Sequence, residues 1–172
     1  MTTLIYVENT YGQSKSANVT VNIILHPIQT IAVNTSQQDV SLQYINIQDY
    51  EEGVSTTLDD HLLVTSTGGF QVNVASTQEN FIQSGSDKTI PVSDVLIRAT
   101  KGSDNNLTPV FDNVFLSTNP ESLIRSETGG MDLKYNVTYD NTAGGSEKYV
   151  NMTSGDSEAV FFSEVTYTIT SK

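Results

Sequence analysis

An alternation of apolar and polar residues with a period of two is the feature that most constrains the fold of this chain. Between residues 132 and 139 every second side chain is apolar, namely Leu133, Tyr135, Val137 and Tyr139. Successive side chains of a β-strand point to opposite faces of the sheet, so this pattern predicts a strand with one buried and one solvated face. The C-terminal segment Val165–Ser171 repeats the pattern, with Thr in the polar row.

The composition favours strands over helices along the whole chain. The sequence holds 17 Val, 12 Ile and 22 Thr, but only 6 Ala. β-Branched side chains pack well on a pleated surface, whereas Ala is the best helix former. A parallel sheet would need crossover helices, and the only helical turn predicted is Asn119–Arg125. We therefore predict an all-β protein built as an antiparallel β-sandwich.

Glycine pairs mark the predicted turns of this sandwich. Thr67-Gly68-Gly69 and Thr128-Gly129-Gly130 each precede an alternating segment, which indicates a hairpin at the first pair and a similar corner at the second. The acidic stretch Asp49–Asp60 is predicted to be a loop. The predicted domain organisation is an N-terminal extension, residues 1–16, followed by one β-sandwich domain, residues 17–172.

The charge balance excludes several classes of partner. The chain carries 8 Lys and Arg against 20 Asp and Glu, a net charge of −12. Such a field repels the phosphate backbone of nucleic acid and the anionic surface of a membrane. No apolar run approaches the ~18 residues of a membrane-spanning helix, so no membrane insertion is predicted. With no cysteine, disulfides and thiolate metal sites are impossible.

The residues that carry catalytic chemistry do not form a recognisable set. The two histidines are His26 and His61, and no Gly-x-Ser-x-Gly motif is present. A metal site at Asp59, Asp60 and His61 is disfavoured, because adjacent side chains on a strand point to opposite faces. The prediction is a protein that is not an enzyme, with no catalytic residue, no metal ligand and no cofactor.

The N-terminal region carries the predicted interface. Ala17, Val19, Val21 and Ile23 alternate with Asn18, Thr20 and Asn22, which predicts a strand with one apolar face. A second apolar segment, Leu4–Val7, is separated from it by the polar stretch Glu8–Ser16. An alternating strand of this kind can add to the open sheet edge of a neighbouring molecule. The residues predicted to form this donor strand are Leu4, Tyr6, Val19, Val21 and Ile23.

The two ends of the chain also resemble a known family. The stretch Ser16–Val33 (SANVTVNIILHPIQTIAV) and the closing strand Val165–Ser171 are similar to the terminal strands of secreted pilin-like proteins of Gram-negative bacteria, including archaic chaperone–usher pilus subunits. The resemblance implies an immunoglobulin-like sandwich that is completed by the N-terminal strand of a neighbour. The disulfide common in such pilins has no counterpart here, because the chain lacks cysteine.

Together these features predict a structural subunit of an extracellular fibre or pilus, secreted or held at the cell surface. Its main partner would be a further copy of itself in a polymer, with a host or surface ligand as a second partner. Two other functions remain open at this stage. One is a stand-alone secreted domain that binds a ligand or carbohydrate, and the other is a viral structural protein.

Overall fold

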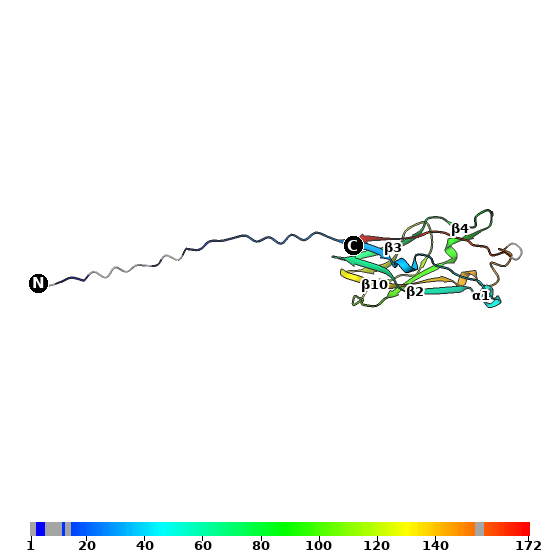
Figure 1. The fold of residues 1–172 in the computed structure, drawn as a ribbon, viewed down its shortest axis with the longest axis horizontal. Coiled ribbons are helices and arrows are strands. Elements are labelled where there is room, and N and C mark those ends of the chain that lie inside the picture. Colours follow the sequence, from blue (N-terminus) through cyan, green and yellow to red (C-terminus); the bar gives the residue numbers. More distant parts are fainter. Residues whose placement is uncertain (1–2, 6–11, 13–14, 154–156) are drawn as a thin grey trace.

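The computed structural model describes residues 3–5, 12, 15–153 and 157–172, and shows an all-β chain whose sheets are antiparallel (Figure 1). Strands hold 43% of the residues and helices 9%, which confirms the all-β prediction. One five-stranded and one four-stranded sheet enclose a single apolar core, and a separate two-stranded sheet lies beside them. We refer to residues 29–172 as the body.

Each sheet mixes strands from both halves of the chain. The five-stranded sheet has the order β1 (Gln29–Val33), β2 (Val54–Ser66), β10 (Gly130–Asn141), β6 (Leu96–Lys101), β8 (Val114–Phe115). The four-stranded sheet has the order β11 (Val165–Ser171), β3 (Phe70–Ser76), β9 (Glu121–Ser126), β7 (Val110–Phe111). The two-stranded sheet pairs β4 (Asn80–Ile82) with β5 (Thr89–Pro91).

Helical structure is confined to short connections. These are α1 (Ile47–Glu52) and the 3₁₀ turns η1 (Thr35–Gln37), η2 (Val92–Asp94) and η3 (Thr142–Gly144). In α1 the side chain of Asn46 accepts from the backbone of Asp49, and the Asp49 carboxylate accepts from the backbone of Asn46. This reciprocal capping box explains why six residues form a helix here. The loop predicted for Asp49–Asp60 therefore begins inside a helix that the sequence pattern did not indicate.

The core confirms the alternation in β10. Leu133, Tyr135 and Val137 are at most 2% exposed, and Tyr139 is also buried. On the other face, Thr138 exchanges a hydroxyl hydrogen bond of 2.8 Å with Thr57 of β2. The apolar row of the strand therefore faces the opposite sheet, while its polar row forms cross-strand pairs at the surface.

The two glycine pairs are corners between sheets. The predicted hairpin at Gly68-Gly69 is wrong, because β2 and β3 belong to different sheets and do not pair. At this corner the Ser66 hydroxyl donates to the carbonyl of Gly68, and at the second corner the Ser126 hydroxyl donates to that of Thr128. A Cβ at Gly129 would collide with the backbone at Ser66. The second corner therefore needs glycine at position 129, because its backbone touches that of the first corner.

Three further predictions differ from the structure. The predicted helical turn at 119–125 is wrong, since Glu121–Ser126 forms β9, where Leu123 and Ile124 are fully buried. Strand β2 already begins at Val54, within the predicted loop. Residues 17–23 form no strand with any described part of the chain, and the first described strand is β1.

Replacing Val137 by Asp should unfold the body, because it would bury a carboxylate that has no partner. We expect a loss of more than about 4 kcal/mol in the free energy of unfolding. Thr138→Asp is the matched control on the solvated face and should cost less than about 1 kcal/mol. Urea denaturation followed by far-ultraviolet circular dichroism measures both. Equal losses would mean that the strand is not buried on one face only.

Candidate assembly surface

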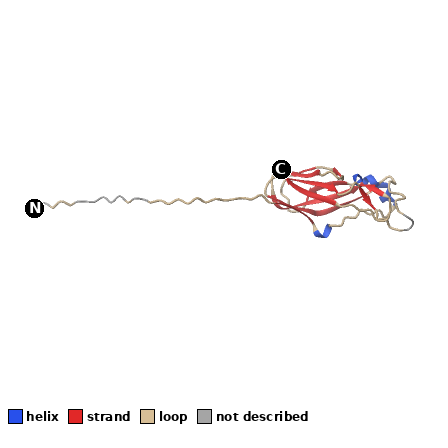
Figure 2. Ribbon diagram, turned by 90° about the horizontal axis from the view of Figure 1, so that it is seen from above, coloured by secondary structure: helices blue, strands red, loops and turns tan. Residues whose placement is uncertain are grey.

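An extended N-terminal segment stands apart from the body. Residues 16–28, which we call the arm, project away from the sheets in both views (Figures 1 and 2). The predicted interface residues Val19, Val21 and Ile23 are 87%, 77% and 84% exposed. Such exposure of several large aliphatic side chains in one segment is typical of a surface that binds a partner.

The other predicted interface residues lie further toward the N-terminus. Leu4 is described and 77% exposed, whereas Tyr6 lies outside the described residues. Ile24 and Leu25, which the predicted interface leaves out, are 75% and 86% exposed. Leu25 continues the row of Val19, so the alternation itself was the signal that would have found it.

The root of the arm is fixed by the first corner of the body. Ile28 donates its N–H to the hydroxyl of Thr67 and accepts from the N–H of Thr67, both at 3.0 Å. Pro27 restricts the preceding residue, His26, to extended backbone. These two constraints direct the arm outward as a continuation of β1.

The arm and the body differ sharply in charge. Residues 16–28 contain no Asp, Glu, Lys or Arg, whereas the body holds 19 Asp and Glu against 7 Lys and Arg, a net charge of −12. Two bodies therefore repel each other, but an arm can approach a body without that cost.

The body offers an incompletely covered edge. β1 and β11, the outer strands of the two sheets, lie next to each other on one side of the body. Apolar residues of these two strands pack on the core but remain partly exposed, and we call them the seam: Ile31, Val33, Val165, Tyr167 and Ile169. In the interior strands the corresponding positions, such as Leu62 and Val72, are fully buried.

A chain of buried hydrogen bonds crosses the core behind the seam. His61, which is 1% exposed, bonds through Nδ1 to Gln37 Oε1 at 3.1 Å and through Nε2 to the Tyr139 hydroxyl at 3.0 Å. The Tyr139 hydroxyl in turn bonds to that of Tyr167 at 2.7 Å. The chain therefore links η1, β2 and β10 to β11, across both sheets.

Burial governs the protonation of this chain. It lowers the pKa of His61 below its usual 6.5, because the protonated ring would be charged in an apolar core. It also raises the pKa of Tyr139 and Tyr167, which stay neutral phenols at physiological pH. The chain thus joins three neutral groups, and its role in the described structure is to hold β11 against the five-stranded sheet.

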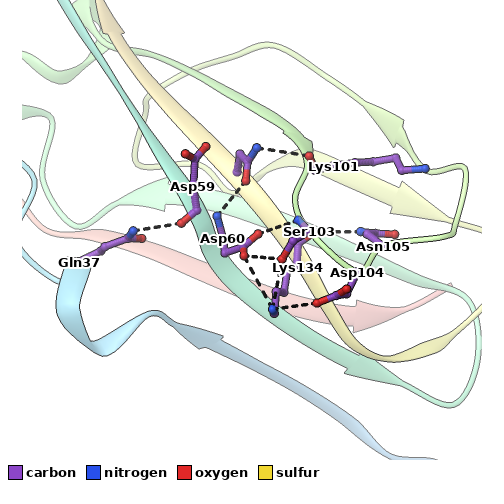
Figure 3. Close-up of polar contacts among 9 residues, drawn as sticks. Gln37, Asp59, Asp60, Lys101, Ser103, Asp104, Asn105 and Lys134 are labelled. Carbon is purple, nitrogen blue, oxygen red and sulfur yellow. Dashed lines mark hydrogen bonds and ion pairs between the residues drawn. The ribbon is translucent and has the colours of Figure 1, made fainter.

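The three side chains considered as a metal site, those of Asp59, Asp60 and His61, point in different directions. Asp59 is exposed, His61 is buried in the core, and Asp60 takes a left-handed backbone with φ of 51° between them. The Asp60 carboxylate accepts from the N–H and the hydroxyl of Ser103, and the Lys134 amine lies 3.8 Å away (Figure 3). These bonds lower the pKa of Asp60, the Ser103 hydroxyl most of all. The Asp60 carboxylate therefore holds the turn at Ser103, and its oxygens already bond to Ser103 and lie near Lys134.

A second polar cluster holds the loop after β10. Buried Asp94 accepts from the Lys148 amine at 2.6 Å and from the Tyr149 hydroxyl at 2.8 Å. Asn141 donates to the Asp94 carbonyl at 3.0 Å and accepts from Tyr44 at 2.5 Å. Burial raises the pKa of Tyr44 to about 12. Because these groups satisfy one another, the cluster is structural.

A hollow of about 790 Å³ lies near the second corner. It is lined by Asp104, Asn105, Asn106, Leu107, Gly129, Gly130, Met131 and Leu133. None of these is aromatic, and protein sites for sugars usually offer a ring on which the sugar face stacks. The hollow therefore gives little support to the carbohydrate-binding alternative.

Comparison of the chain with protein-family models and with characterised proteins gave no match. Within the described ranges, no helix has the length and apolar character needed to cross a membrane. The same part of the chain holds no cluster of three or more metal-binding side chains.

We expect the body to lose stability as the pH falls below about 6.5, the ordinary pKa of His61. The unfolded chain then binds a proton that the folded chain resists, so stability declines with falling pH until the lowered pKa is reached. The slope for this one group is at most about 1.4 kcal/mol per pH unit. Urea denaturation from pH 7.5 down to about 5 measures it.

The matched variant is His61→Gln, which keeps a hydrogen-bonding side chain but cannot titrate. It should be less stable than the native chain at neutral pH, with a flatter decline below it. The pKa of Asp60 is lowered from its usual 3.8, so protonation of Asp60 changes the stability only at a pH below the range of this experiment. If the free energy of unfolding falls equally with pH in the two proteins, His61 is not the cause of the decline.

Proposed function

We propose that the protein is a structural subunit of an extracellular fibre, assembled by docking the arm of one copy on the body of the next. The arm carries the proposal. It is an uncharged, alternating segment that pairs with no strand of the described residues, and it projects from an acidic body. The two antiparallel sheets around one core are compatible with the immunoglobulin-like sandwich implied by the terminal strands.

The pattern of the arm suits addition to a sheet edge. If Val19, Val21, Ile23 and Leu25 face a partner, the polar row Asn18, Thr20 and Asn22 faces water. Burying each of the four large apolar side chains contributes about 1.5–3 kcal/mol before the cost of ordering the arm. The main chain of an added strand supplies hydrogen bonds, and its alternate side chains set the register.

Replacing both Val19 and Val21 by Asp should abolish assembly, because it would place two charges in the apolar row. The control is Asn18→Asp with Thr20→Asp, which adds the same charge to the polar row and should assemble far better. Both pairs are exposed, so the free energy of unfolding should stay within about 0.5 kcal/mol of the native value.

The measurement is size-exclusion chromatography over a concentration series, with electron microscopy of the fractions that elute early. The native chain and the polar-row control should form multimers, whereas the apolar-row variant should remain a folded monomer. A native chain that stays monomeric up to millimolar concentration would defeat the proposal. Equal assembly of the two variants would show that the apolar row is not the contact.

Salt should promote this assembly. Raising the ionic strength from about 0.1 M to about 1 M shortens the Debye length from about 10 Å to about 3 Å, and so screens the repulsion between two bodies of charge −12. The contact of an uncharged arm is not weakened by the same change. Light scattering during a salt titration measures the effect. Dissolution of multimers at high salt would instead point to a contact made by ion pairs.

A further inference from the structure

Resting on the proposed function, we infer that β11 is the edge that receives the arm of a second copy. The candidates are the outermost strands of the two sheets: β1, β8, β7 and β11. Strands β7 and β8 contain two residues each, too few to pair with an arm whose apolar row spans residues 17–25. The choice lies between β1, with five residues, and β11, with seven.

The hydrogen bonds to β3 fix which groups of β11 remain free. Thr77 donates to the carbonyl of Glu164, and Lys172 donates to that of Gly69. In a regular antiparallel pair the bonded residues alternate, and the register of β11 on β3 has no shift. The N–H and C=O groups of Val165, Tyr167, Ile169 and Ser171 therefore point to the open side.

The open edge of β11 also lacks the usual protection against added strands. Edge strands in natural proteins are commonly guarded by charged residues, prolines, bulges or short length. Val165–Ser171 has seven residues, no charge, no proline and no bulge, in a body whose net charge is −12. An unguarded edge of this length favours a strand partner, and the uncharged arm matches it.

The seam beside this edge provides the place for the apolar row of the arm. A strand added to β11 continues the four-stranded sheet, and its inward side chains lie over Ile31 and Val33 of the opposite sheet. These residues are partly exposed in the single chain, as is Tyr167. Docking covers them and the outer end of the hydrogen-bond chain that leads to His61.

The edge of β1 is the weaker candidate. Only Gln29, Ile31 and Val33 direct free backbone groups outward, because Ile28 and Asn34 on either side are bonded to β2 and its corner. It is also the strand from which the arm of the same copy departs. A neighbour that pairs there has to pass the root of that arm.

Disulfide trapping tests the assignment, because the chain contains no cysteine of its own. Thr168 points outward on β11, and Asn18, Thr20 and Asn22 form the outward row of the arm. Thr168→Cys is combined with a cysteine at each of the three arm positions in turn, since a disulfide needs Cα atoms within about 7 Å. The control set replaces Thr168→Cys by Thr30→Cys, an exposed outward position on β1.

We expect at least one arm position to give a ladder of multimers with Thr168→Cys on a non-reducing gel, and none to do so with Thr30→Cys. The single-cysteine variants are run alongside, because a chain with two cysteines can also form a ladder from disulfides between like positions. Where neither single-cysteine variant forms dimers, a ladder from the pair requires the arm of one copy to meet the strand of the next. A ladder with Thr30→Cys, or no ladder while the cysteine-free chain still forms multimers, overturns the assignment to β11. If the cysteine-free chain forms no multimers, the proposed function itself fails.

Discussion

The pairing of β2 with β10 is the interaction on which the rest of the body depends. These are the two longest strands, and between Tyr135 and Val137 their register shifts, so that β2 carries extra residues between Leu58 and Leu62. Asp60 occupies that bulge with a positive φ, and its N–H donates to the Asn136 side chain at 2.8 Å. A bulge bends a strand and re-aims its side chains. Here His61 and Leu62 are both buried, although they are adjacent in sequence.

This irregularity connects the core to the edge of the body. Once His61 faces inward, its ring can join Gln37 to Tyr139, and Tyr139 can join Tyr167 of β11. The outermost strand of the second sheet is thus held by a polar contact as well as by packing. A buried polar chain of this kind is strong only when every member is satisfied. The position of β11, and with it the seam, follows from the bulge in β2.

Much of the fold could be predicted where each residue had one clear environment. β10 and β11 were found because each has a single apolar row that faces the core. A helical turn was predicted at 119–125 because Asn119 and Pro120 often begin helices. The segment forms a strand instead, because Leu123 and Ile124 are buried in the core between the sheets. The bulge at Asp60 could not be predicted from the sequence, because its hydrogen-bond partners Ser103 and Asn136 are distant in sequence. The seam exists because β1 and β11 are the outermost strands on one side of the two sheets. The alternation of apolar and polar residues does not predict which strands are outermost.

The arm also shows that an alternating pattern alone does not predict the structure of a segment. Its row of Val19, Val21 and Ile23 has the pattern of β10, yet it forms no strand, because a strand needs an edge to pair with as well as an alternating sequence. Its apolar side chains add nothing to the stability of the single chain while they remain in water. In the proposed assembly, their burial becomes available only when a second body is present, so the added stability grows with concentration. The acidic bodies repel over about a Debye length, whereas the apolar contact acts only at touching distance. In that assembly, free subunits would therefore be kept apart at low ionic strength until an arm reaches a neighbouring body.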